Sequence, residues 1–142
     1  LMLARVERAG AHGHERAAVE TVIHQAIADL PERDRIRIDS EASLPDLPLP
    51  APLASTALRN LLENALRHGT NGETVELRVQ CSGTDLVMTV TNPAGDHAPA
   101  DPERSDGLGL TIVRAITERF DARFEFRHPR EGMVEAVITW PT

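Results

Sequence analysis

Tyrosine is absent from this 142-residue sequence, and aromatic residues account for only 3% of it. We therefore expect an aliphatic core built from Leu, Val, Ile and Ala. The single cysteine, Cys81, excludes an internal disulfide and a multi-cysteine zinc site. Because Cys81 follows Val79 and Gln80 in a strand-like stretch, we expect a buried, unreactive thiol. The scarcity of cysteine also favours a reducing, cytosolic environment.

Long apolar runs and an excess of basic residues are also missing. No apolar run approaches the roughly 18–20 residues of a membrane-spanning helix, and no signal peptide is visible. The sequence has 22 acidic and 15 basic residues and a net charge of −7. This balance disfavours a nucleic-acid-binding surface, which needs a basic face. The length fits one globular domain.

The order of the predicted elements indicates the fold class. Helical spacing of apolar residues predicts three helices, which cover residues 16–30, 52–68 and Leu108–Arg119. Alternation predicts five strands, which cover residues 35–39, 74–81, 85–91, 122–128 and 133–140. The first strand is expected to be half-buried, and the other four form two hairpins. Hairpins rather than repeated βα units predict an α+β two-layer sandwich, with a mixed, largely antiparallel sheet and three helices on one face.

The second predicted helix carries two asparagines, Asn60 and Asn64. Asparagine is a poor helix-interior residue, because its amide competes for backbone hydrogen bonds. At about 100° per residue, Arg67 and His68 fall on the same side as both asparagines, and the leucines fall on another. Two interpretations are open: a solvated helix face, or a polar site. In a polar site, an asparagine oxygen suits Mg²⁺ and Arg67 neutralises phosphate.

Other local signals mark helix ends and turns. Ser55 or Thr56 is expected to cap the first turn of the second helix. The stretch SDGLGL (residues 105–110) opens the third helix, where glycines allow backbone N–H groups to approach an anion closely. The stretch TNPAGD (residues 91–96) breaks a strand into a turn. Each of these signals is weak when taken alone.

In this order, the motifs resemble those of the ATP-binding catalytic domain of sensor histidine kinases, in the superfamily that includes gyrase-type ATPases. NLLENALRHG (residues 60–69) resembles the N box of that family, and DGLGLTIV (residues 106–113) resembles its second glycine box. VTNPAG (residues 90–95) stands in the place of the first glycine box. The resemblance implies a Bergerat ATP-binding fold over residues 14–142. Residues 1–13 would then be the end of a dimerisation helix and a linker.

The resemblance also implies ATP and Mg²⁺ as cofactors and assigns roles to residues. Asn64 would coordinate Mg²⁺, Asn60 and Arg67 would lie near the phosphates, and His68 would lie against the nucleotide. Asn92 stands where the family usually has an aspartate that accepts a hydrogen bond from the adenine amino group. The other implied ATP-binding residues are Ala94, Gly95, Gly107, Leu108, Gly109 and Leu110.

The sequence departs from the family pattern at some positions. Ala94 replaces the first glycine of its box, and the phenylalanine-bearing box between the glycine boxes is missing. A threonine usual on the penultimate strand is replaced by Met133 or Val134. Glu63 lies on a different side of the helix from Asn60, the position where gyrase-type relatives have a water-activating glutamate. This difference favours a kinase over a hydrolase.

The implied partners are a dimerisation domain that carries the phosphoacceptor histidine, and a response regulator. His14 is not expected to be the acceptor, because the Arg-Thr-Pro of the acceptor box does not follow it. We expect a cytoplasmic domain of an inner-membrane sensor, which is a homodimer at full length and a monomer as this isolated domain. Two alternatives remain: a degenerate module of this fold that acts in protein–protein interaction, and an anti-sigma-factor-type serine kinase.

Overall fold

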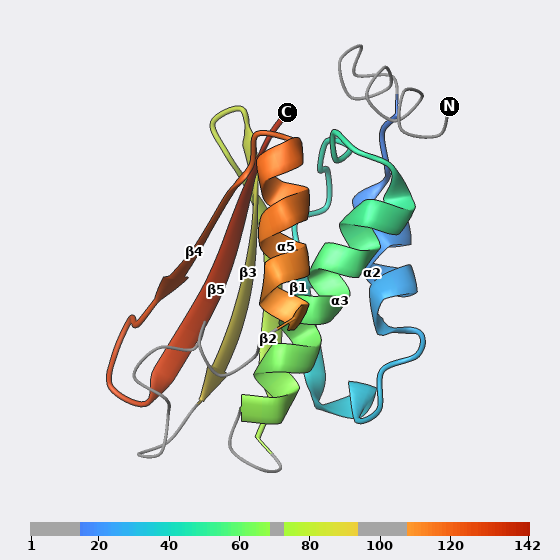
Figure 1. Cartoon of the computed structure of the whole chain (residues 1–142). Coiled ribbons are helices and arrows are strands. Elements are labelled where there is room, and N and C mark those ends of the chain that lie inside the picture. The colour runs from blue at the N-terminus through green and yellow to red at the C-terminus, as the bar shows by residue number, and fades with distance from the viewer. Residues whose placement is uncertain (1–14, 69–72, 94–107) are drawn as a thin grey trace.

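The computed structural model describes residues 15–68, 73–93 and 108–142. In these ranges, helices α2 (Val19–Ile27), α3 (Ala51–His68) and α5 (Leu108–Arg119) cover one face of a sheet (Figure 1). A short 3-10 helix, η1 (Arg33–Arg35), precedes the first strand. The three predicted helices are confirmed, although α2 is shorter than expected. None of the helices in these ranges has the length and apolarity needed to cross a membrane.

The sheet is mixed and largely antiparallel, as predicted. Its strands are β1 (Ile36–Ser40), β2 (Val75–Ser82), β3 (Asp85–Pro93), β4 (Arg123–Arg127) and β5 (Met133–Pro141). They lie in the order β1-β2-β3-β5-β4, with only β1 and β2 parallel. Both predicted hairpins are present, and the first turns through Gly83, whose φ of +64° suits glycine. The α+β sandwich is therefore confirmed.

Two helical crossovers explain this strand order. Because β1 and β2 are parallel, the chain must return along the sheet between them, and α3 makes that return. β3 and β4 both run antiparallel to β5, so they are parallel to each other, and α5 lies between them in the chain. Both crossovers run over the same face, which places α3 and α5 side by side (Figure 1).

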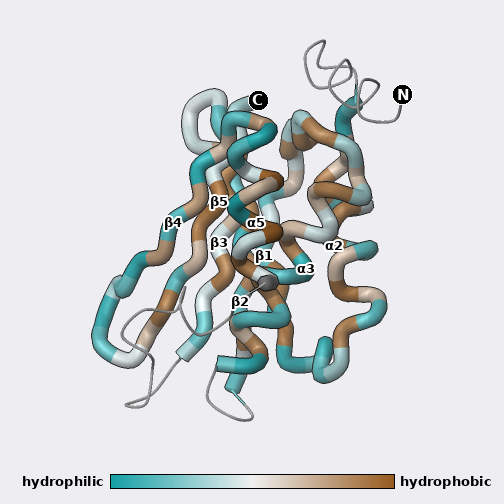
Figure 2. Tube along the Cα trace, in the orientation of Figure 1, coloured by the Kyte–Doolittle hydropathy of each residue, from teal (hydrophilic) through white to brown (hydrophobic). Residues whose placement is uncertain are grey.

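The core lies between the helices and the sheet. Every second residue of β3 is buried, and so are the residues of β5 that face the helices. These buried residues include Leu86, Met88 and Trp140. Figure 2 shows hydrophobic positions along these central strands and hydrophilic positions at the turns. The helices contribute mainly leucine, isoleucine, valine and alanine. The expected aliphatic core is confirmed, and Trp140 at 0% exposure is its largest member.

Neither Ser55 nor Thr56 caps α3, so that prediction is wrong. The helix begins at Ala51, about one turn before both residues. The Ser55 hydroxyl instead donates to the Pro52 carbonyl at 3.2 Å, and the Thr56 hydroxyl donates to the same carbonyl at 2.7 Å. Serine and threonine within a helix often bond back to the preceding turn in this way.

Two predictions of burial are also wrong. Cys81 is exposed, because the buried alternation of β2 stops after Val79 and residues 80–82 are all exposed at the hairpin end of the strand. The first strand was expected to be half-buried, but only Ile36 of β1 is partly buried, and Ile38 is 41% exposed. The reason is that β1 forms an edge of the sheet, whereas α2 packs mainly against α3.

Replacing Leu62 with alanine should lower the free energy of unfolding by about 2–5 kcal/mol, because it leaves a cavity where α3 meets the sheet. Leu62 is fully buried, whereas Leu53 in the same helix is only partly buried. Leu53→Ala is therefore a matched control that should cost clearly less. Urea unfolding measures both losses, and equal losses would contradict the assignment of Leu62 to the core.

Candidate nucleotide-binding site

The residues singled out in the sequence gather at one end of the helix layer. Figure 1 shows the C-terminal end of α3 and the end of β3 in the lower part of the molecule, with the first turn of α5 above them. Asn64 lies in the last turns of α3, Asn92 near the end of β3, and Gly109 in the first turn of α5. Three segments that are distant in the sequence therefore contribute to one region.

Asn64 is the most unusual of these residues. Its side chain is only 6% exposed, and its Oδ1 atom has no hydrogen-bond partner among the described residues. A buried polar atom without a partner costs about 1–3 kcal/mol. The neighbours of Asn64 on the same helix, Leu61 and Ala65, are buried in the core, so the packing of α3 fixes the amide in this place. Asn64 Oδ1 is thus a buried hydrogen-bond acceptor that accepts no hydrogen bond from any described residue.

The other polar residues of α3 differ in their surroundings. Asn60 is partly buried, and its Nδ2 atom donates to the Thr56 carbonyl one turn earlier at 2.8 Å. His68, the last residue of α3, is also partly buried, whereas Arg67 is exposed. Arg67 lines a hollow of about 340 Å³ on the side of α3 that faces Leu30. These four polar side chains of α3 therefore differ in solvent exposure: Asn64 is buried, Asn60 and His68 are partly buried, and Arg67 is exposed.

Glu63 is the carboxylate of α3 nearest to this stripe in the sequence. Its Oε1 atom accepts a hydrogen bond from Arg59 Nε at 3.0 Å, one turn earlier on the helix. Glu63 and Arg59 line the same hollow as Arg67. This ion pair agrees with the expectation that Glu63 lies on a different side of α3 from Asn60, the position of the catalytic base in gyrase-type relatives.

Asn92 is buried near the end of β3, at 6% exposure. Its Nδ2 atom lies 3.5 Å from the Pro93 carbonyl, at the long limit of a hydrogen bond. The register of β3 and β5 places Val134 opposite Asn92, and Met133 opposite Pro93. The sequence left open which of these two residues takes the threonine position. The strand pairing shows that Val134 is the apolar neighbour of Asn92.

The start of α5 supplies the backbone part of the site. Gly109 is partly buried, and Leu110 is 2% exposed, which anchors this turn in the core. No acidic side chain lies in the first turn of α5. The N-terminal end of a helix presents N–H groups and a positive dipole, which favour anions such as phosphate. Of the other predicted residues, Leu108 begins α5, while Ala94, Gly95 and Gly107 lie outside the described residues.

Comparison with known proteins identifies the class of protein that this fold and site define. A family profile described as "Histidine kinase-, DNA gyrase B-, and HSP90-like ATPase" matches residues 51–142. The chain belongs to this family, and ATP binding is the property that the family implies. The matched segment includes α3 and α5, and thus every described residue of the site.

Similar proteins narrow the class further. Sensor protein QseC of Salmonella typhimurium is 32% identical over 98 residues, which cover 62% of this chain and 22% of QseC. Heme sensor protein HssS of Staphylococcus aureus is 28% identical over 102 residues, which cover 63% of this chain and 22% of HssS. The chain thus spans about a fifth (22%) of the length of these relatives.

Solved structures show the same fold. Histidine kinase AdeS of Acinetobacter baumannii superposes with a TM-score of 0.71 at 14% identity, over 97% of this chain and 74% of that chain. The cytoplasmic segment of histidine kinase QseC superposes with a TM-score of 0.61 at 22% identity, over 88% of this chain and 76% of that chain. The chain therefore shares its fold with these histidine kinases.

In the nucleotide-free chain, Asn64→Leu should leave the free energy of unfolding unchanged or raise it by about 1 kcal/mol, because it removes a buried oxygen that has no partner. Leu61→Asn is the matched control on the same helix. It should be strongly destabilising, because it buries an amide in place of an apolar side chain. Urea unfolding tests both variants, and a large loss for Asn64→Leu would show that Asn64 has a structural role instead.

Proposed function

We propose that this chain is the Mg·ATP-binding catalytic domain of a two-component sensor histidine kinase. It binds ATP and presents the γ-phosphoryl group to a histidine on a separate dimerisation domain. The observation that carries the proposal is the buried Oδ1 atom of Asn64, which has no partner among the described residues. Family membership and the sensor kinases among the relatives support the same conclusion.

The residues present fit a magnesium ion at Asn64. Mg²⁺ binds few protein ligands and completes its coordination with phosphate oxygens and water. A neutral amide oxygen serves this purpose without adding a negative charge beside the triphosphate. When bound, Mg²⁺ would neutralise charge on the phosphate oxygens during phosphoryl transfer. Asn64 is already buried in position, so little side-chain entropy is lost when it takes up a ligand.

The remaining residues of the chain bind and orient the nucleotide. The first turn of α5, with Gly109, offers backbone N–H groups to the phosphates. The side-chain oxygen of Asn92 accepts a hydrogen bond from the adenine amino group, and this bond lacks the extra strength that a charged carboxylate would give it. His68 packs against the nucleotide, and Asn60 approaches the phosphates from α3. Arg67 lines the hollow beside Glu63, so its side chain would extend from that side of α3 toward the phosphates when a nucleotide binds. Catalysis then consists mainly of positioning and charge neutralisation.

The same residues favour transfer to an acceptor over hydrolysis. A hydrolase of this superfamily would have a glutamate at position 60, where this chain has an asparagine that bonds to its own helix. Glu63 is engaged by Arg59 on another side of α3. With no carboxylate of α3 placed to activate water, bound ATP stays intact until an acceptor histidine arrives.

The proposed partners follow from the kinase function. They are the dimerisation domain with its phosphoacceptor histidine, and a response regulator that receives the phosphoryl group. Residues 14–142 would form the catalytic domain, and residues 1–13 would join it to the dimerisation helix. The whole protein would be a dimeric membrane sensor with this domain in the cytoplasm.

ATP titration with and without Mg²⁺ tests the metal ligand. Asn64→Ala should weaken binding in the presence of Mg²⁺ by about tenfold, roughly 1.4 kcal/mol, and should remove most of the dependence on Mg²⁺. Glu63→Gln is the matched control on the next residue of α3, and it should bind like the unsubstituted chain. Unchanged Mg²⁺ dependence in Asn64→Ala would refute the role of Asn64. Absence of saturable binding at millimolar ATP would instead favour a degenerate interaction module.

Phosphoryl transfer tests the kinase function itself. The chain alone should not become labelled by γ-labelled ATP, because the acceptor histidine lies outside it. A separately prepared dimerisation domain should become labelled on histidine when the chain is added. A phosphohistidine is acid-labile and a phosphoserine is acid-stable. Acid-stable labelling of a protein serine would therefore favour the serine kinase alternative.

A further inference from the structure

Asn92 ends the buried row of β3. Every second residue of this strand is buried in the core, and the other members of the row, Leu86, Met88 and Val90, are apolar. A polar side chain at 6% exposure in such a row costs free energy unless its hydrogen bonds are made. Asn92 therefore stands where an apolar residue would continue the core, and its amide needs a partner.

The protein itself does little to fix this amide. Its Nδ2 atom lies 3.5 Å from the Pro93 carbonyl, and the described residues give the side chain no other hydrogen bond. Val134, which lies opposite Asn92 on β5, has no polar atom in its side chain. The last side-chain torsion angle of asparagine has a broad, roughly two-fold preference. The amide can therefore turn by about 180° at the cost of one weak hydrogen bond.

A primary amide presents a hydrogen-bond acceptor and a donor side by side. The edge of adenine presents its amino group as a donor beside N1, which is an acceptor. Guanine and hypoxanthine are 6-oxopurines, and their edge reverses this pattern: the 6-oxo oxygen accepts, and N1–H donates. An amide that turns matches either edge with two hydrogen bonds. A carboxylate only accepts, so it can match the amino group of adenine but not the 6-oxo oxygen.

We propose that Asn92 lets the nucleotide site accept 6-oxopurine nucleotides as well as ATP. This inference rests on the proposed function, in which Asn92 contacts the base. With adenine, Oδ1 accepts from the amino group, and the contact between Nδ2 and the Pro93 carbonyl is kept. With a 6-oxopurine, the amide turns, so that Nδ2 donates to the 6-oxo oxygen and Oδ1 accepts from N1–H. Only the weak bond to Pro93 is lost, so ATP is favoured by less than about tenfold.

Inosine triphosphate (ITP) is the probe, because its base differs from that of ATP only by the 6-oxo group and N1–H. Calorimetric titration of the full chain with each nucleotide in the presence of Mg²⁺ should give dissociation constants within about tenfold of each other. A larger preference for ATP would overturn the inference and leave the proposed function intact. Failure of both nucleotides to bind would contradict the proposed function, and the inference would fall with it.

Asn92→Asp removes the donor and keeps the shape of the side chain. At about pH 8 the carboxylate is ionised, so the 6-oxo oxygen of ITP would face a second acceptor. The ratio of the dissociation constants of ITP and ATP should rise at least about tenfold above that of the unsubstituted chain. Gln80→Glu makes the same amide-to-carboxylate change at an exposed position of β2, and it should leave this ratio unchanged. An unchanged ratio in Asn92→Asp would overturn the inference.

Asn92→Leu provides a second test, because a buried carboxylate can also destabilise the fold. It removes the donor and the acceptor together and suits the apolar row of β3. It should weaken the binding of ATP and ITP by a similar factor of about tenfold. Unchanged affinity for both nucleotides would show that Asn92 does not contact the base. A loss of affinity for ATP alone would show that the amide serves adenine only, and either result would overturn the inference.

Discussion

The packing of α3 against the sheet is the interaction on which the rest of this structure depends. Leu58, Leu61 and Leu62 are at most 1% exposed. Burial of each contributes about 1.5–3 kcal/mol, and together they exceed the cost of about 1–3 kcal/mol for one buried oxygen without a partner. The leucines therefore hold the helix in place, and Asn64 is carried along in a position where its Oδ1 atom has no partner among the described residues. An oxygen held in this way by its neighbours' packing would be preorganised for the metal ion that we propose.

Much of the fold could be predicted because its signals are local. The apolar period of α3 and α5 and the alternation of the two hairpins are properties of each segment alone, and the structure confirms them. Burial at Cys81 and Ile38 could not be predicted in this way. Both residues lie in strands with regular alternation, but the depth of each depends on which helix covers it. No described helix covers the edge strand at Ile38 or the hairpin end at Cys81. The alternation of residues along a strand does not reveal whether a helix covers that strand.

The burial of the candidate site residues could not be predicted from the sequence either. A helical projection places Asn60, Asn64, Arg67 and His68 on one side of α3, but an angle around the axis does not give depth. The neighbouring elements bury Asn64 and leave Arg67 exposed beside Glu63. The missing partner of Asn64 Oδ1 likewise depends on all surrounding donors. The choice of Val134 as the residue opposite Asn92 required the strand register.

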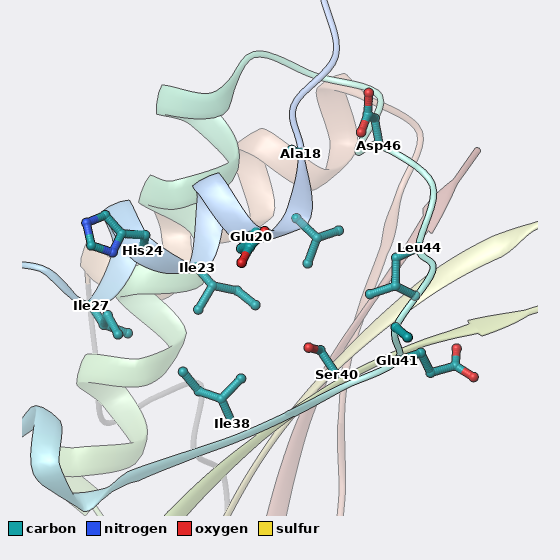
Figure 3. Close-up of a pocket in the computed structure, with 12 residues that line it drawn as sticks. Ala18, Glu20, Ile23, His24, Ile27, Ile38, Ser40, Glu41, Leu44 and Asp46 are labelled. Atoms are coloured by element: carbon teal, nitrogen blue, oxygen red, sulfur yellow. The ribbon is translucent and has the colours of Figure 1, made fainter.

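A groove of about 590 Å³ between α2 and the edge strand β1 (Figure 3) follows from the same topology that builds the site. The crossover from β1 to β2 places α3 over the middle of the sheet, and α2 packs against α3, so the outer strand β1 is left without a helix of its own. One side of α3 thus contacts α2, and another contacts α5, whose first turn belongs to the proposed nucleotide site. Through α2 and α3, the groove has a physical connection to the proposed nucleotide site, and the two are coupled energetically only if a change at the groove moves α3.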